Sequence, residues 1–486
     1  MTVDPVSTDD WLAVRNPRTG ALDARIKPTS PAEVAARARR LRAAQPAWAE
    51  LGVEGRIEAL RAFAKACAKR RDDLVSALEA DTGRLTETAM EVDAIAAMVE
   101  RWARWAPDVL NPGGERTTGH AELVWRQHHA PYPLLGVISP WNSPLGLSLI
   151  DAVPALIAGC VVLIKPSEVT PRFLEPLGAA LAECAPLNTV LAFVAGAAQT
   201  GEAVVAQADA VCFTGSVATG RKVAVACAQR LIPAFLELGG KDPAIVLEGA
   251  DLDRAAAGIA WGGTMNAGQL CLSIERVYVE QAVADAFTER LVGEMARLRH
   301  CDADTPGGAL GPVIFEPQAA VIRRHLDDAR AKGARVLTGG TIEQRGGGLW
   351  CAPTVLTRVD HSMAVMTEET FGPLLPVMTV SDAAQALQLA NDTIYGLSAS
   401  VWGPETRAAD LAARINAGAV SVNDAALTSL VQDAEKMAFG QSGLGGSRMG
   451  PGSILRFVRK KAVLLSRFQG ADPWWFTGAR LQAGRS

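Results

Sequence analysis

Short apolar segments alternate with helical segments over most of the chain, and this alternation limits the fold more than any other feature. From residue 133 onward, segments typical of buried strands occur at 134–139, 161–165, 190–194, 210–214 and 234–238. Helical segments such as 217–229 lie between them. Strands that alternate with helices pair in parallel, and helices then cover both faces of the sheet. We therefore expect a doubly wound α/β sheet with ligands at the carboxyl ends of its strands.

The alternation continues beyond this first unit and predicts a second one. Further strands are expected at 244–247, 276–280, 336–338, 374–380, 399–402 and 420–423. The helices between them are expected at 251–266, 283–298, 316–332, 382–391 and 406–416. Residues 31–105 have helical spacing, residues 111–132 indicate a β-hairpin that leaves the main body, and 455–465 indicate a late strand outside either sheet. The chain thus divides into two α/β units and a projecting β element.

Cys271 lies where an enzyme can hold an exposed thiol, at a turn that includes Gly268 and Gln269 between a predicted helix and a predicted strand. The eight cysteines are widely spaced and form no CxxC pair or Cys/His cluster, so we expect reduced thiols, with neither disulfide nor metal. Most cysteines are small buried hydrophobic residues, and this is the alternative for Cys271. Among the eight, Cys271 is the candidate nucleophile.

Two predicted strand ends carry residues suited to a nucleotide. Lys165 and Glu168 follow the strand at 161–165 and could reach ribose hydroxyls, although an ordinary polar loop is the alternative. The segment 213–220 crosses from a strand into a helix, where Gly215 permits the turn and Ser216 can cap the helix. Backbone N–H groups at such a helix start suit a pyrophosphate. The segment is neither GxGxxG nor a P-loop, so it predicts a dinucleotide held in an unusual way.

Three further positions carry polar groups for catalysis or binding. Glu237 ends a very apolar strand and is a candidate general base, with a salt-bridged or capping role as the alternative. Asn142 in Pro-Trp-Asn-Ser-Pro could donate its side-chain N–H to a developing oxyanion, or could be a turn residue. Glu368 and Glu369, before Phe-Gly-Pro, could anchor a second ribose or cap a loop.

These motifs, in this order, resemble the aldehyde dehydrogenase superfamily from about residue 10 to about residue 465. The likeness rests on PWNSP, KPSE, FTGSVATG, ELGGK, GQLC, EETFGP and the later Asn423. It implies an aldehyde dehydrogenase-like fold: two Rossmann-like doubly wound α/β domains plus an oligomerisation element formed by a β-hairpin and a C-terminal strand. The implied division is 1–112 and 132–238 for NAD(P) binding, 239–444 for catalysis, and 113–131 with 445–486 for oligomerisation.

The resemblance also assigns roles. It makes Cys271 the nucleophile, Glu237 the base that activates water for hydrolysis of the thioester, and Asn142 the oxyanion donor together with the Cys271 backbone N–H. Lys165 and Glu168 match contacts to the adenosine ribose, Ser216 a pyrophosphate contact and Glu369 a nicotinamide-ribose contact. The other cofactor contacts implied by these motifs are Ser139, Pro140, Trp141, Ser167, Phe213, Thr214, Gly215, Gly220, Leu238, Gly239 and Phe371.

The sequence departs from the family where the substrate is bound. The usual FGGxKxSG stretch reads as residues 438–446 without its Lys, and Cys271 is followed by Leu-Ser-Ile-Glu. The one Arg near Cys271, Arg276, matches a structural position of the family, which disfavours a carboxylated semialdehyde. An apolar or aromatic aldehyde is expected from Trp141, Leu147, Leu270, Leu272 and Ile274. The alternatives are a CoA-acylating enzyme or a semialdehyde dehydrogenase within the family, and a cofactor-independent thiol esterase outside it. The six histidines lie away from the motifs, which disfavours the esterase.

Charge and composition limit the partners. A net charge of −4 and a pI near 6.0 disfavour nucleic acid and anionic membranes. The first ten residues are acidic and carry no signal-peptide core, so we expect a cytoplasmic protein. Glu168 favours NAD because it would repel a 2′-phosphate, while NADP stays possible. We expect a homodimer or homotetramer, with the apolar 472–476 tail meeting a neighbour or the mouth of the substrate tunnel.

Overall fold

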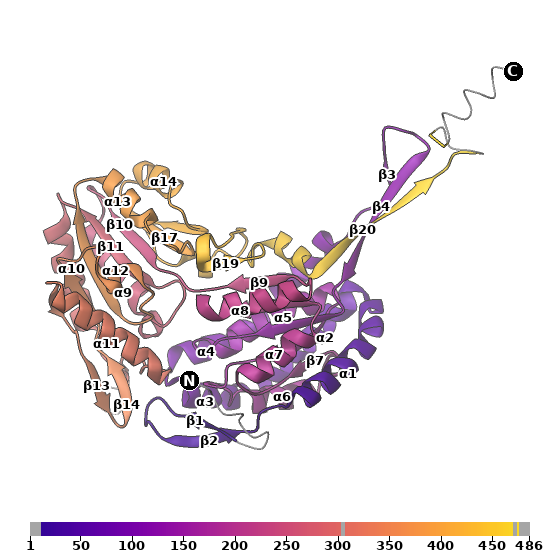
Figure 1. Ribbon diagram of the computed structural model, residues 1–486, viewed down its shortest axis with the longest axis horizontal. Helices are drawn as coiled ribbons and strands as arrows, with labels where there is room; N and C mark the ends of the chain where they lie inside the picture. The colour runs from indigo at the N-terminus through magenta and orange to yellow at the C-terminus, as the bar shows by residue number, and fades with distance from the viewer. Residues whose placement is uncertain (1–10, 303–306, 470–473, 476–486) are drawn as a thin grey trace.

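The computed structural model describes residues 11–302, 307–469 and 474–475. The first ten residues, and residues 472, 473 and 476 of the apolar tail, therefore lie outside the described part. Two lobes form the body of the molecule, and a β arm projects from it (Figure 1). Each lobe is built around one twisted sheet, as the alternation of strands and helices predicts.

The first lobe contains a six-stranded sheet in the order β19-β9-β8-β5-β6-β7. Its strands are β5 (Leu134–Ile138), β6 (Val161–Lys165), β7 (Leu191–Phe193), β8 (Ala210–Thr214), β9 (Ala234–Glu237) and β19 (Gly443–Leu444). All neighbours pair in parallel except β19, which is antiparallel to β9. β6 and β8 are buried along their whole length, which explains why their sequences are continuously apolar.

Helices cover both faces of this sheet. They are α1 (Pro31–Glu50), α2 (Gly52–Lys69), α3 (Arg71–Thr82), α4 (Thr86–Leu110), α5 (Pro144–Ala158), α6 (Leu174–Ala182), α7 (Ala198–Gln207) and α8 (Val217–Gln229). On one face α5 packs against α4, and on the other α7 packs against α1 and α8 (Figure 1). α5 and α8 both begin just after a strand of the sheet, so their N-terminal ends lie at its carboxyl edge.

The second lobe contains a seven-stranded sheet in the order β12-β15-β16-β11-β10-β17-β18. Its strands are β10 (Asp242–Val246), β11 (Ile274–Glu280), β12 (Arg335–Thr338), β15 (Thr354–Thr357), β16 (Leu374–Val380), β17 (Ser398–Trp402) and β18 (Ala419–Val422). Its helices are α9 (Leu252–Thr264), α10 (Ala284–Arg297), α11 (Glu316–Ala331), α12 (Ala364–Thr367), α13 (Ala383–Asn391) and α14 (Glu405–Ala412). Only β12 pairs antiparallel, with β15. The six strands expected from the sequence are present, and β15 is an additional one.

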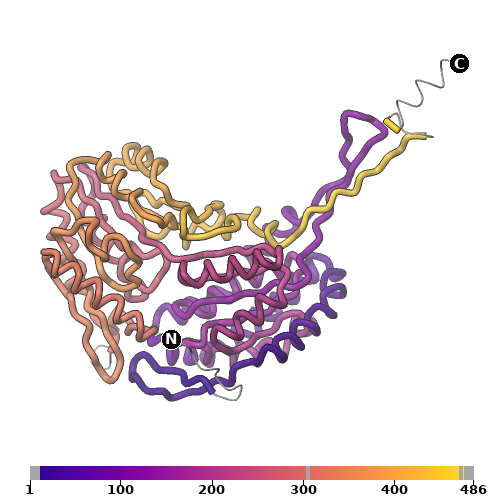
Figure 2. Tube along the Cα trace, in the orientation of Figure 1, coloured from indigo at the N-terminus to yellow at the C-terminus, as the bar shows by residue number. Residues whose placement is uncertain are grey.

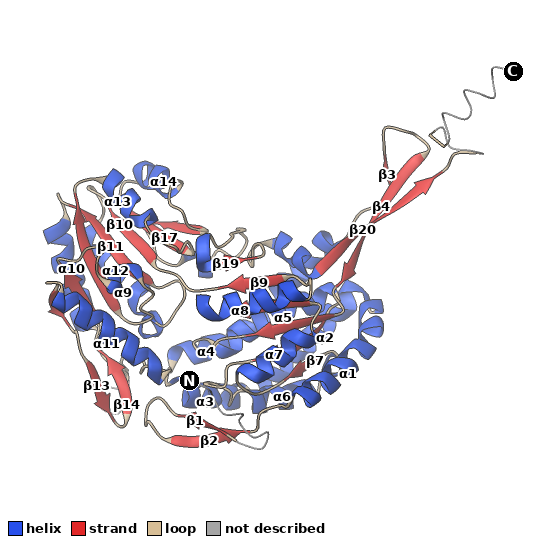
Figure 3. Cartoon of the chain, in the orientation of Figure 1, coloured by secondary structure: helices blue, strands red, loops and turns tan. Residues whose placement is uncertain are grey.

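The projecting arm is a three-stranded antiparallel sheet in the order β20-β4-β3 (Figure 3). It joins β3 (Arg116–Thr117) and β4 (Leu123–Pro131) to β20 (Val458–Ser466), which pairs with β4 along nine residues. The chain trace shows these distant segments side by side (Figure 2). This confirms both the hairpin and the late strand outside the two main sheets.

Two small hairpins complete the fold: β1 (Leu12–Arg15) with β2 (Leu22–Ile26), and β13 (Ile342–Arg345) with β14 (Gly348–Cys351). Neither pair is evident from the sequence pattern. The division into domains at residues 112, 131, 238 and 444 stays a prediction. Within the described residues, no helix combines the length and apolar character that crossing a bilayer requires.

Candidate active site

A cavity of about 680 Å³ lies at the carboxyl edge of the first sheet and extends to the loop that carries Cys271. The residues that follow β5, β6, β8 and β9 line it, as expected for the ligand site of a doubly wound sheet. Cys271, Glu237 and Asn142 all line this cavity. The structure therefore brings together the three candidate catalytic residues from separate parts of the chain.

Cys271 lies between the short helix η2 (Met265–Gly268) and β11. It is half-buried, whereas the other seven cysteines are buried. Burial raises the pKa of its thiol to about 11, opposed mainly by the positive charge of Lys436 and reinforced by Glu237 and Asp242. The thiol is therefore protonated near neutral pH in the cofactor-free protein, and it has to lose its proton before it can attack a carbonyl carbon.

Asn142 follows β5 and is 4% exposed. Its Nδ2 donates to the backbone oxygen of Gln269 at 2.9 Å. The side chain of Gln269 is itself fixed, because its Nε2 donates to the carbonyl of Pro312 at 3.1 Å and its Oε1 accepts from Ile314 N at 2.9 Å. One hydrogen of the Asn142 amide group is thus used internally, and the other remains for a ligand in the cavity.

Glu237 is the last residue of β9 and is half-buried. In the sheet it lies opposite Thr214 of β8 on one side and Gly443 of β19 on the other. The carboxylate thus lies at a strand end that both neighbouring strands hold in place. None of the six histidines lines the cavity, so Glu237 is the candidate base beside Cys271.

The opposite part of the cavity holds the residues expected to bind the adenosine end of a dinucleotide. Lys165 is 6% exposed, and its Nζ donates to Glu168 Oε2 at 2.8 Å. Ser216 caps α8 by accepting a hydrogen bond from Thr219 N at 3.3 Å, as the sequence predicts. The strand order β6-β5-β8-β9 places the start of α8 between Glu168 and the end of β9.

Glu369 provides a second carboxylate near the end of β9. Its Oε1 accepts from Gly240 N at 2.9 Å, and a Cβ added to Gly239 would lie 2.5 Å from both of its carboxylate oxygens. Burial, and then the negative charge of Glu275, raise the pKa of Glu369 to about 8. Glu275 in turn fixes the loop by accepting hydrogen bonds from the N–H groups of Thr370 and Phe371, both at 2.7 Å.

These features fit a dinucleotide. The cavity presents a carboxylate at each end, one of them paired with a buried lysine, and an α-helix N-terminus between them, which matches two riboses joined by a pyrophosphate. Fourteen of the fifteen expected cofactor contacts line it. Gly220 does not: a Cβ there would lie 2.5 Å from Leu238 Cδ2, so this glycine permits close packing of α8 against the chain after β9.

Several residues of the site are not evident from the sequence. Phe315 lines the cavity and lies 5.7 Å from the ring of Trp141, which also packs edge-on against Phe371 at 5.4 Å. Arg448 bonds Asp151 Oδ2 at 2.7 Å and the hydroxyl of Thr214, which places a buried cation beside the strand end of Glu237. No local motif marks either residue, because both come from distant segments.

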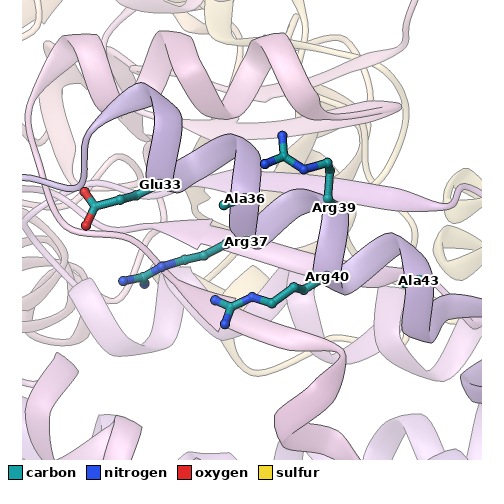
Figure 4. A pocket seen from close by; sticks show the side chains of 6 residues that line it. All are labelled: Glu33, Ala36, Arg37, Arg39, Arg40 and Ala43. Atoms are coloured by element: carbon teal, nitrogen blue, oxygen red, sulfur yellow. The ribbon is translucent and has the colours of Figure 1, made fainter.

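A second hollow, of about 610 Å³, lies along α1 and is lined by Glu33, Ala36, Arg37, Arg39, Arg40 and Ala43 (Figure 4). It contains no candidate catalytic residue, and the Arg37 guanidinium is bonded to the backbone oxygen of Phe193. Among the described residues, no group of three or more His, Cys, Asp and Glu side chains is arranged to hold a metal ion. The first cavity is therefore the candidate active site.

Comparison with known proteins identifies the family and the fold. The profile of the aldehyde dehydrogenase family matches residues 3–463. A Mycolicibacterium smegmatis protein with the provisional name succinate-semialdehyde dehydrogenase, NADP(+), is 39% identical over 91% of this chain and 86% of its own. A 4,4'-diapolycopene aldehyde oxidase of Methylomonas sp is 35% identical over 85% of this chain and 78% of its own. The solved structure of PutA from Anabaena variabilis, provisionally described as an aldehyde dehydrogenase, is 51% identical with a TM-score of 0.94, covering 96% of this chain and 100% of that one.

Proposed function

The chain belongs to the aldehyde dehydrogenase family and oxidises aldehydes with NAD(P), and we propose that Cys271, Glu237 and Asn142 carry out this reaction. The observation that carries the proposal is their convergence in one cavity with the dinucleotide-binding features. After the Cys271 thiol has released its proton to solvent, its sulfur bonds to the aldehyde carbon, and the C=O π electrons move onto the oxygen, which Asn142 stabilises. A nicotinamide dinucleotide held by Lys165, Glu168, Ser216 and Glu369 would supply the acceptor for the hydride that this carbon loses.

Loss of the hydride leaves a thioester on Cys271, which water has to hydrolyse. Glu237 takes a proton from the water as the water oxygen bonds to the thioester carbon. The C–S bond then breaks, the thiolate leaves, and the carboxylic acid is released. A CoA-acylating enzyme transfers the acyl group to a thiol and does not need this base, so Glu237 in the cavity supports hydrolysis.

We propose an apolar or aromatic aldehyde as the substrate. Arg276, the cation nearest to Cys271 in sequence, is used structurally, since its guanidinium donates to the backbone oxygens of Lys241, Leu389 and Ala390. The segment 427–444, which reaches Glu237 through β19, exposes Leu430, Val431, Met437, Phe439 and Leu444. The relationship to a 4,4'-diapolycopene aldehyde oxidase also supports an apolar substrate.

A semialdehyde is the second candidate, and Lys436 is the residue that favours it. Lys436 is half-buried on the same segment, and its charge is the strongest influence that lowers the pKa of the Cys271 thiol. A cation so close to the thiol could pair with a substrate carboxylate, as the name of the Mycolicibacterium smegmatis relative would require. If this candidate is right, replacing Lys436 by Ala should cut kcat/KM for succinate semialdehyde by much more than that for hexanal, which should fall only through the higher pKa of the Cys271 thiol.

We further propose NAD as the preferred cofactor, a homodimer or homotetramer as the assembly and the cytoplasm as the location. Glu168 in the cavity supports NAD, and all eight cysteines are free, which suits a reducing compartment. Leu464 is 77% exposed on β20, at the open edge of the projecting arm, which supports assembly through this sheet. Trp474 packs on Phe468 at 5.2 Å, close to the same arm.

The experiment mixes the protein with hexanal, benzaldehyde or succinate semialdehyde and with NAD or NADP, and follows the absorbance of the reduced cofactor. We expect reduction with NAD and the highest kcat/KM for hexanal or benzaldehyde, and Cys271→Ala should abolish the reaction. A Cys271→Ala variant that retains activity would remove this cysteine from the mechanism. A preference for succinate semialdehyde would replace the apolar substrate class by the second candidate.

A further inference from the structure

A left-handed turn leads directly into the candidate nucleophile. Asn266, Ala267 and Gly268 have φ angles of 53°, 54° and 73°. Residues with a Cβ adopt this conformation rarely, apart from Asn and Asp, so Ala267 holds a strained backbone that surrounding contacts must fix. Gly268 permits a close approach, because a Cβ there would lie 2.3 Å from the backbone carbon of Gly372. The turn therefore packs closely against the loop that precedes β16.

Asn266 makes the contacts that hold this turn. Its Nδ2 donates to the backbone oxygens of Asn142 and Gln269, each at 3.1 Å. Its own backbone oxygen accepts from Gln269 Nε2 at 3.0 Å and from Gln269 N at 3.1 Å. Asn266 is 1% exposed and does not line the cavity. Its side chain thus bridges the segment of the candidate oxyanion donor and the segment of the candidate nucleophile.

The Gln269 backbone oxygen is shared between two carboxamides. It accepts from Asn142 Nδ2 at 2.9 Å and from Asn266 Nδ2 at 3.1 Å. Asn142 is thereby fixed at both ends, since Asn266 holds its backbone oxygen and also holds the acceptor of its side chain. One Asn142 N–H is committed to Gln269, which fixes the direction of the other N–H. An oxyanion donor gains its effect from being fixed before the reaction begins.

We propose that Asn266 is a positioning residue, which fixes the Asn142 carboxamide for the oxyanion through the backbone oxygen of Gln269. The proposal rests on the proposed function, in which Asn142 stabilises the negative oxygen of the thiohemiacetal. Asn266 touches neither substrate nor cofactor, so its effect on the reaction has to pass through Asn142. This dependence distinguishes it from a residue that only stabilises the fold.

A double-mutant cycle tests this dependence. The variants are Asn142→Ala, Asn266→Ala and the double variant, and Asn391→Ala is the control. Asn391 lies outside the cavity, and its side chain bonds the backbone oxygen of Arg414 at 3.2 Å and the N–H of Asn416 at 2.8 Å. Two rates are measured: the acylation burst with p-nitrophenyl acetate without cofactor, and kcat/KM for aldehyde oxidation.

We expect Asn142→Ala to lower both rates by about 100- to 1,000-fold, as loss of an oxyanion donor does. Asn266→Ala should lower them by about 10- to 100-fold through misplacement of that donor. In the Asn142→Ala background, the second substitution should cost less than about twofold, because its target is already absent. The KM for NAD and all rates of Asn391→Ala should stay within about twofold of wild type.

Three outcomes would overturn the proposal. Equal losses from Asn266→Ala in both backgrounds would show that Asn266 does not act through Asn142. If Asn266→Ala fails to fold, Asn266→Asp replaces it, because Asp has the size of Asn and tolerates the left-handed backbone but lacks the Nδ2 donor. Wild-type rates in Asn266→Asp would also overturn the proposal. Absence of NAD(P) reduction by the wild type with any aldehyde would overturn the proposed function as well, whereas additive losses in an active wild type overturn this inference alone.

Discussion

The ion pair between Lys165 and Glu168 allows a specific prediction about the preference for NAD over NADP. Lys165 Nζ lies 2.8 Å from Glu168 Oε2, and the exposed fractions of the two side chains are 7% and 39%. Both residues line the cavity. Glu168→Gln keeps the shape of the side chain but removes its negative charge. The change also leaves the buried Lys165 cation without its carboxylate partner, which makes this end of the cavity positive.

The expected size of the effect follows from hydrogen-bond energies. A hydrogen bond to a charged group contributes about 1.5–3 kcal/mol. The partial exposure of Glu168 puts its proposed bond to the ribose hydroxyl of NAD near the lower value. Loss of about 1.5 kcal/mol corresponds to about a tenfold weaker use of NAD. Removal of the repulsion from a 2′-phosphate should favour NADP by a similar factor, about tenfold. The ratio of kcat/KM for NADP to that for NAD should therefore rise by about 100-fold.

The assay measures kcat/KM for both cofactors at a saturating aldehyde concentration and at fixed ionic strength. Glu175→Gln is the control, because Glu175 is an exposed acid in the first turn of α6, outside the cavity. The control should leave the ratio unchanged. A Glu168→Gln variant with the wild-type ratio would refute the assignment of Glu168 to the ribose.

Three other perturbations have clear expected outcomes. Burial raises the pKa of the Cys271 thiol to about 11, so its alkylation by iodoacetamide in the cofactor-free protein should accelerate up to about that pH. Mass spectrometry measures the alkylation, and a plateau near pH 8 would contradict this expectation. Asp151→Asn leaves the buried Arg448 without its carboxylate and should cost about 3–5 kcal/mol, seen as a lower midpoint of urea unfolding; an unchanged midpoint would contradict this. Gly239→Ala forces the Glu369 carboxylate away from the Gly240 N–H and should raise the KM for NAD by about tenfold. Alkylation of Cys271 without cofactor should not slow. An unchanged KM would speak against a contact between Glu369 and NAD.

The sequence predicts most of the fold because the strands are buried on both faces. Continuous apolar runs such as those of β6 and β8 are unambiguous, and helices between them require parallel pairing. β15 is missed although it is as long as β12, because it begins directly after Pro353, a residue that marks a turn in the sequence. The antiparallel edges made by β12 and β19 are also not predictable from alternation, since pairing direction at an edge depends on distant segments.

The candidate site is predicted where a residue follows a strand, and it is missed where contacts cross the chain. Asn142, Glu237 and Ser216 follow strands of one sheet, so their side chains meet at one edge. Asn266, which holds Asn142, and Arg448, which bonds Thr214 opposite Glu237, have no local signal. Arg448 reaches Thr214 across 234 residues, and Asn266 reaches Asn142 across 124. The Asn266 contact depends on the packing of the two lobes, and the Arg448 contact depends on the return of the chain to the first lobe at β19. No short motif encodes either.

The central claim is that the aldehyde is oxidised while covalently bound to Cys271 and is then released by water that Glu237 activates. Glu237→Gln tests it most directly. With NAD and an apolar aldehyde, this variant should form one equivalent of NADH per active site in the first turnover, with a steady rate about 100-fold below wild type. Mass spectrometry should then find the acyl group on the Cys271 peptide. A full steady rate in Glu237→Gln, or a burst with no acyl group on Cys271, would contradict the account.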